Sequence, residues 1–217
     1  MRKFIVSAIT AAGMFSAPAQ AADMPVKARV LAPASEWKWT GLYVGVVCGG
    51  GWGTSEQTAP GVPSTGRFDV SGGTVGGTLG FNWQRGPLVL GVEADYAWAN
   101  MRGSTTSVCG VECLTELRSL GTARGRLGYS LGQLLPYLTG GYAFGNLRRG
   151  FGATSGSEFA DGWTLGGGLE AMFAPHWSAK AEYLYVDLGN TNVPIAGFPT
   201  TVTFQTHLLR FGFNYRF

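Results

Sequence analysis

Apolar and polar side chains alternate with a period of two along the last segment of the chain, residues 201–217. One face carries, in order, Leu209, Phe211, Phe213, Tyr215 and Phe217, whereas the residues between them are mostly polar or small. Period two is the pattern of a β-strand whose two faces meet different environments. Large aromatic side chains that continue to the final residue indicate a strand that closes a barrel whose outside faces lipid.

Seven earlier segments alternate in the same way. They span residues 40–53, 73–84, 88–99, 116–131, 135–149, 160–173 and 177–188. With the last segment this makes eight strands, an even number, as single-chain bacterial membrane barrels have. We therefore predict an all-β fold, an eight-stranded antiparallel transmembrane β-barrel.

The connections between these segments alternate in length. Tight turns are expected at residues 85–87, 132–134 and 174–176. The other four connections are longer and span residues 54–72, 100–115, 150–159 and 189–200. Since outer-membrane barrels have short periplasmic turns and long extracellular loops, we expect both termini to lie in the periplasm.

The tryptophans lie near the ends of the predicted strands. Trp83 and Trp177 lie at turn ends, whereas Trp52, Trp98 and Trp163 lie at loop ends. Trp37 and Trp39 flank the start of the first strand, and none of the seven falls in mid-strand. This distribution predicts two aromatic belts, one at each membrane surface.

The first 36 residues differ from the rest. Residues 1–21 have a basic start, a short apolar stretch and the sequence Ala19-Gln20-Ala21, which together predict a cleaved signal peptide. Residues 22–36 contain two prolines and no alternation, so we predict a periplasmic tail there. The barrel is then expected to span residues 37–217.

The composition fits a membrane barrel. Charged residues make up 13% of the chain, against about 25% in soluble proteins, and no mature stretch has the apolar length of a spanning helix. Removing the signal peptide lowers the formal net charge from +3 to +1. There is no basic run, so we expect no binding to nucleic acid.

Charged residues collect on the faces predicted to point into the barrel. They are Glu93, Asp95, Arg124, Arg126, Glu170, Lys180, Glu182 and Arg210, whose charges sum to zero. Paired carboxylates are compatible with acid–base catalysis. However, side chains fill the interior of an eight-stranded barrel, and buried charges must be paired. We therefore predict a salt-bridged plug with little conductance.

Other side chains raise the question of chemistry. His207 has outward parity near the rim, with Asp187 close by, and some barrel enzymes use Ser, His and Asp at that level. No serine is singled out by its spacing, so we expect no enzyme, no cofactor and no metal site. Cys109 and Cys113 are close enough in the sequence to form a disulfide in an oxidising compartment, and Cys48 is expected to be free.

Several motifs resemble a known family. The landmarks are WTGLYVG at Trp39, LGVEADY at Leu90, ARGRLGY at Ala123 and the terminal FNYRF. Together they resemble the small alphaproteobacterial outer-membrane β-barrel proteins, a porin family with OmpA-like transmembrane barrels. The resemblance implies a location in the outer membrane of a Gram-negative cell, and the group includes major surface proteins and hemin-binding proteins.

We expect a structural role in envelope integrity and the display of surface loops. A small-solute porin, a surface protein that binds a hemin-type ligand, and an adhesin for a host surface are the alternatives. The expected partners are outer-membrane lipid, lipopolysaccharide and the barrel-assembly machinery. That machinery is expected to read Phe213, Tyr215 and Phe217 as an assembly signal.

Overall fold

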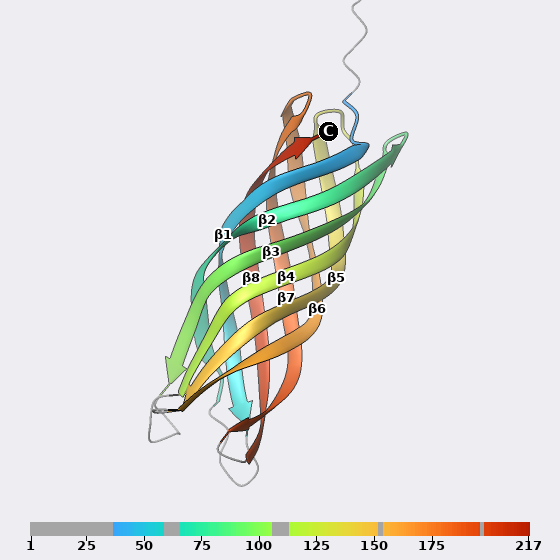
Figure 1. The fold of residues 1–217 in the computed structure, drawn as a ribbon. Coiled ribbons are helices and arrows are strands. Elements are labelled where there is room, and N and C mark those ends of the chain that lie inside the picture. Colours follow the sequence, from blue (N-terminus) through green and yellow to red (C-terminus); the bar gives the residue numbers. More distant parts are fainter. Residues whose placement is uncertain (1–36, 59–65, 106–112, 152–153, 196–197) are drawn as a thin grey trace, which may run out of the picture. The chain divides into compact units, whose positions relative to one another are not determined.

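The computed structural model describes residues 37–58, 66–105, 113–151, 154–195 and 198–217 as one closed antiparallel barrel (Figure 1). Its strands are β1 (Gly41–Thr58), β2 (Phe68–Arg85), β3 (Leu88–Thr105), β4 (Cys113–Tyr129), β5 (Leu134–Phe151), β6 (Thr154–Ala174), β7 (Trp177–Ile195) and β8 (Phe198–Arg216). Each strand pairs with the next, and β8 pairs with β1. The predicted fold class is confirmed.

The period-two pattern becomes an inside and an outside. Along β2, buried and exposed residues alternate almost without interruption from Phe68 to Gln84. Apolar side chains such as Val75, Leu79 and Phe81 are about half exposed on the outside, whereas Thr74 and Thr78 are buried inside. Because alternate residues of a strand point to opposite faces, the period-two pattern decides which side chains point into the barrel and which point outward.

The strands wind steeply around the barrel. Following paired residues from Asn100 once around all eight strands leads back to Leu90, ten residues earlier on β3. For eight strands, such a stagger corresponds to a tilt of about 40°. Each residue therefore advances about 2.5 Å along the barrel axis.

The strands are longer than the sequence pattern predicted. They contain 17 to 21 residues, although about 9–11 tilted residues cross a membrane. The predicted long connections are therefore largely strand, and only residues 59–67, 106–112, 152–153 and 196–197 lie between strands at that end. Two of these connections are as short as the turns, so loop length does not distinguish the two ends.

The aromatic belts explain the extra length. Trp98 lies eight residues along β3 from Leu90, the partner of Trp83, so about 20 Å of barrel separates the two belts. This is close to the roughly 25 Å apolar band of outer-membrane barrels. The strand then continues beyond Trp98 to Thr105. Trp98 is thus inside its strand, contrary to prediction, because the barrel extends past the membrane surface. The same holds for Trp52 on β1 and Trp163 on β6.

The polarity of the barrel wall inverts at the belt on this side. Between the belts, large apolar side chains point outward and charged ones inward. Beyond the belt, the described inward side chains are mostly apolar and include Phe68, Met101 and Phe204, together with the buried polar pair Ser55 and Thr115. Outward residues there are mostly polar, among them Asn100 and Arg102. The outer surface of the wall is therefore apolar where it faces lipid and polar where it faces water.

Trp39 does not belong to a belt, which corrects the prediction from sequence. Its side chain is fully buried and packs with Val89, Leu135 and Met172 inside the turn end of the barrel. Its indole N–H donates to the Gly132 carbonyl at 3.1 Å. Trp39, just before β1, therefore packs into the barrel mouth and closes it with an apolar cap, against which Trp37 also packs.

The predicted signal peptide (1–21) and tail (22–36) lie outside the described residues. So does Cys109, and the side chain of Cys113 is not described, so the proposed disulfide stays a prediction. Cys48 is a free thiol exposed on the outer face of β1, as its parity indicated. Within the part of the chain that the structure covers, no helix has the length and apolarity to cross a membrane.

Candidate functional site

The eight charged residues predicted to point inward all lie inside the barrel, and each is at most 6% exposed. They come from five strands, β3, β4, β6, β7 and β8. Direct cross-strand partners include Glu93 with Arg124 and Glu182 with Arg210. The structure therefore brings the whole predicted set together within the part of the barrel that lies between the belts.

Arg124 is the centre of this ionic network. Its guanidinium group donates to Glu93 on the adjacent strand, to Asp95 at 2.8 Å and to Glu182 across the lumen at 2.9 Å. The planar group with several donors suits such multiple contacts with carboxylates. Arg124 thus ties β4 to β3 on one side and to β7 on the other.

Arg210 completes a ring of charges. It donates to Asp95 at 2.9 Å and to Glu182 at 2.6 Å, the two acids that Arg124 also contacts. Each of these carboxylates is therefore held by two arginines from different strands. The sequence predicted neighbouring pairs, but these contacts reach across the barrel and join β3, β4, β7 and β8.

A second group of charges lies closer to the turn end. Arg126 donates to Glu170 at 2.6 Å and to Glu93 at 3.3 Å. Lys180 lies directly opposite Glu170 in the ladder, yet its ammonium group pairs with Glu93 at 2.7 Å. Glu93 therefore accepts from three cations and connects the two groups of charges.

Two tyrosines that parity alone could have revealed complete the network. The Tyr43 hydroxyl donates to Glu93 and accepts from Arg126, each at 2.7 Å, and the Tyr137 hydroxyl donates to Glu182 at 3.1 Å. Arg126 also stacks over the Tyr137 ring, 3.9 Å from its centroid. Both hydroxyls are thus satisfied inside the barrel, as buried polar groups must be.

Glycine makes room for one of these rings. A Cβ atom at Gly80, which points inward from β2, would collide with the ring and hydroxyl of Tyr43. A glycine in a strand often marks such a close approach. The glycine-rich sequence of β2 is therefore explained in part by the width of the side chains that fill the lumen.

Arg216 is a ninth buried charge that was not in the predicted set. It is 4% exposed, lies 3.6 Å from Glu170 and stacks over Trp39 at 4.8 Å. Its place on the polar face of β8 was visible in the sequence. With Arg216 the described part of the lumen carries five basic and four acidic side chains, so the lumenal charges do not sum to zero as predicted.

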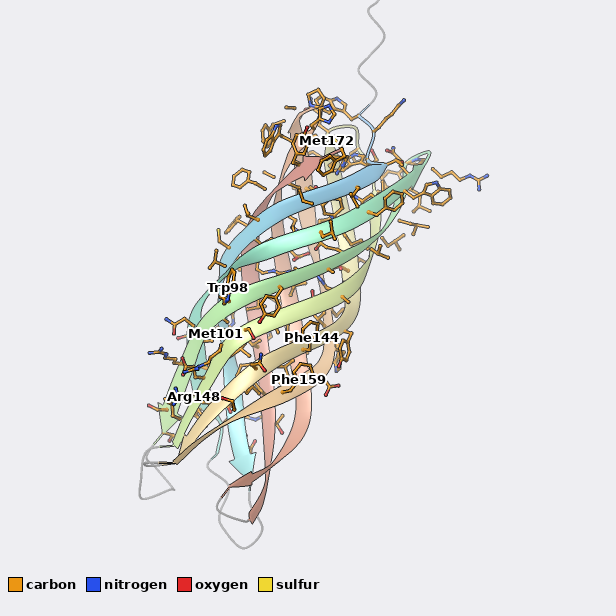
Figure 2. All side chains as sticks on the ribbon, viewed as in Figure 1. Trp98, Met101, Phe144, Arg148, Phe159 and Met172 are labelled. Atoms are coloured by element: carbon orange, nitrogen blue, oxygen red, sulfur yellow. The ribbon has the colours of Figure 1, made fainter. Side chains whose placement is uncertain are left out.

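The lumen is filled along its length. Trp39, Val89, Leu135 and Met172 pack at the turn end, and the ionic network follows. A larger apolar cluster fills the loop end of the lumen and begins at about the level of the loop-side belt. It contains Phe68, Val70, Met101, Leu117, Leu120, Ala143, Leu147, Ala160, Leu184, Val186, Leu188, Phe204 and Leu208. Figure 2 shows Met172 and Met101 in these two different zones of the barrel.

His207 lies on the outer wall among aromatic residues. Its ring stacks on Trp52 with a centroid distance of 6.0 Å, and its Nδ1 is hydrogen-bonded to the Tyr183 hydroxyl at 2.6 Å. Asp187 accepts from Gln205 instead. A histidine held by a phenol and stacked on an indole forms part of the aromatic belt rather than a catalytic triad.

The predicted assembly residues lie on the outer face at the end of β8. Phe213 and Phe217 are more than half exposed. Tyr215 contacts Trp177 and Phe217 edge-on, with centroid distances of 5.1 and 5.2 Å. Figure 1 places the C-terminus at the turn end of the barrel. Whether the assembly machinery reads these side chains stays a prediction.

Comparisons with known proteins agree with this geometry. A family model of the outer membrane protein beta-barrel domain matches residues 7–217. The chain is 36% identical to the 31 kDa outer-membrane immunogenic protein of Brucella melitensis, and the match covers 100% of both chains. It is 34% identical to the 22 kDa outer membrane protein of Rhizobium leguminosarum, over 77% of this chain and 69% of that one.

Solved structures share the fold at low identity. Neisserial surface protein A matches with a TM-score of 0.50 and 14% identity, over 82% of this chain and 98% of that one. OprG from Pseudomonas aeruginosa matches with a TM-score of 0.50 and 15% identity, over 82% and 97%. Taken with the barrel geometry and the family match, these relatives show that the chain is an outer-membrane β-barrel protein and belongs to the outer membrane protein β-barrel domain family.

Proposed function

We propose that this protein is a closed structural barrel that contributes to envelope integrity and displays its loop end at the cell surface. The observation that carries the proposal is the filled lumen. Between the belts the interior holds an ionic network, and apolar clusters lie on both sides of it. Side chains fill an eight-stranded barrel, whereas sixteen strands leave an aqueous channel.

The pairing of the lumenal charges supports a plug over a selectivity lining. In a water-filled pore, solvent could stabilise unpaired charges. Here Glu93, Asp95 and Glu182 each contact at least two cations, and none is more than 6% exposed. Pairing of these carboxylates with more than one cation each is what buried negative charges require when water is absent.

We expect the purified protein to give no steady conductance in a planar bilayer, because ions would have to cross both the ionic network and the apolar clusters. A sixteen-stranded porin in the same bilayer serves as the positive control. Large, stable conductance from the folded monomer would contradict the proposal and favour a small-solute porin. In cells, a deletion strain should become more sensitive to detergents without losing uptake of small solutes.

The proposed orientation places the turns and both termini in the periplasm and the extended end outside. Its support is the wall beyond the loop-side belt, which is polar outside and therefore suited to water. The relatives in Brucella are named outer-membrane immunogenic proteins, which favours exposure of part of this chain at the cell surface. On this basis the surface display is a property of the extended wall as well as of the connections.

Orientation can be tested with two cysteines at opposite ends of β3. In a background without the native cysteines, Ser104→Cys should react with a membrane-impermeant maleimide on intact cells. Pro87→Cys, in the turn before β3, should react only after the outer membrane is permeabilised. Both residues are exposed, so a difference reports the side of the membrane. The reverse pattern would overturn the orientation.

A further inference from the structure

Three arginines point outward from neighbouring strands beyond the loop-side belt. The side chains of Arg102 on β3 and Arg118 on β4 are 62% and 50% exposed, and Arg148 on β5 is partly exposed. Glu116 pairs with both Arg102 and Arg148 in the ladders. The register therefore gathers these arginines into one patch, which we call the arginine patch.

Among the described side chains, one acid lies within the patch. Glu116 contacts Arg102 at 3.1 Å and Arg118 at 3.6 Å, and its own side chain is 11% exposed. The four side chains together carry a net charge of +2. Because the side chains of Arg102 and Arg118 are at least half exposed, solvent screens these two ion pairs, each of which contributes about 0–1 kcal/mol. These guanidinium groups can therefore turn to an anionic ligand at small cost.

The positive charge is confined to one side of the extended wall. On the described part of β6–β8, the outward charged residues beyond the belt are acids, Asp161 and Asp187, with Gln205 beside them. The exposed Arg67, which directly precedes β2, lies 3.6 Å from Glu56 on β1. The arginine patch is therefore a local feature rather than a general property of this end.

Two phenylalanines adjoin the patch. Phe144 and Phe159 stack with a centroid distance of 5.9 Å, and Phe159 is 57% exposed in a zone where other outward residues are mostly polar. In Figure 2, Arg148 and Phe159 lie further toward the loop end than Trp98. Exposed apolar rings beside cations are typical of a binding surface.

The height of the patch identifies its environment. Arg102 is four residues beyond Trp98, or about 10 Å further along the axis. Since the belt marks the edge of the hydrocarbon, the guanidinium groups reach the layer of lipid headgroups. In the outer leaflet of a Gram-negative outer membrane, that layer contains phosphorylated glycolipid.

We propose that the arginine patch, with Phe159 beside it, binds the phosphorylated sugar headgroup of the outer-leaflet glycolipid, the lipid A part of lipopolysaccharide. Arginine is suited to this ligand because its fork of donors matches phosphate oxygens. The exposed ring supplies an apolar surface next to the charges. This site rests on the proposed orientation, since only an extended end that faces outward meets this lipid.

The test compares two variants with the same loss of charge. R102Q/R118Q/R148Q removes the patch, whereas K38Q/R67Q/R85Q removes three exposed cations elsewhere. Folding is checked first by heat-modifiable migration on gels. Native mass spectrometry of protein in detergent micelles then measures binding of bisphosphorylated, monophosphorylated and dephosphorylated lipid A. These micelle measurements do not depend on orientation or conductance, so their failure is distinguishable from failure of the proposed function.

We expect the patch variant to bind bisphosphorylated lipid A at least about tenfold more weakly than the unmodified protein, since several charge-assisted contacts are lost. The control variant should bind nearly normally, and loss of phosphates should weaken binding to the unmodified protein. Equal weakening in both variants, or no dependence on phosphate, would overturn the proposal. Preferential binding of a soluble sulfated polysaccharide at the patch would also overturn it.

Discussion

Arg124→Ala should lower the free energy of unfolding by about 3 kcal/mol, at the low end of the range for breaking a buried ion pair. The substitution removes the one cation that contacts Glu93, Asp95 and Glu182 together. Each acid keeps another cation, Asp95 and Glu182 through Arg210, and this limits the loss. Urea unfolding of the purified protein in lipid vesicles measures the effect.

Arg118→Ala is the matched control on the same strand. Arg118 is half exposed and its contact with Glu116 is 3.6 Å long, so its removal should change the free energy of unfolding by less than about 1 kcal/mol. Adding Glu182→Gln to Arg124→Ala should restore part of the loss, because it removes one of the three carboxylates that lose a cation partner. Equal stability of the Arg124→Ala and unmodified proteins would show that the network does not stabilise the barrel.

The sequence was sufficient to predict the number of strands and which of their residues point inward, because period two is a local property. The inward parity of Glu93 and Arg124 follows from their neighbours along the strand, and direct pairing across a hairpin follows from the turn between strands. Arg216, Tyr43 and Tyr137 have the same inward parity. They could have been included in the lumenal network by applying that rule to every strand.

Contacts across the lumen could not be predicted from the sequence. Lys180 lies opposite Glu170 in the ladder but pairs with Glu93, because a flexible side chain selects among several acids in a narrow space. The stagger of the strands, defined by the ten-residue offset along β3 after one circuit of the barrel, decides which side chains meet across the lumen. This stagger is a property of the closed barrel. Parity alone carries no such information.

The length of the strands was missed for a different reason. The strands were predicted from outward apolar residues, and these residues end at the membrane surface. Beyond Trp98 the strand continues through Asn100 and Arg102 with polar residues outward and Met101 inward. The period is unchanged, but the polarity of the two faces is reversed, because water replaces lipid outside. A period-two pattern whose polarity reverses at the belt predicts the longer strands.

Phe217→Asp should sharply reduce the amount of folded protein in the outer membrane of cells, while the purified protein still refolds in detergent micelles. The two results differ because the described contacts of Phe217 are few. Its side chain is 66% exposed and packs edge-on against Tyr215, and its backbone N–H donates to Leu42. A charge at the edge of the apolar band costs only about 0–1 kcal/mol, so the folded barrel should tolerate it.

Recognition of the last strand during assembly would depend on the aromatic face itself, which Phe213, Tyr215 and Phe217 present in the unfolded chain. The matched control is Phe173→Asp, since Phe173 is 61% exposed near the same turn-side belt but lies on β6. Phe173→Asp likewise removes an exposed ring but leaves the last strand unchanged.

The measurement compares the heat-modifiable fraction in isolated outer membranes with the refolding yield in micelles. Normal insertion of Phe217→Asp, or an equal defect in both variants, would contradict an assembly signal at the end of β8. A defect confined to cells and to Phe217→Asp is the expected result, because only assembly in the cell requires the last strand to be recognised before the barrel closes.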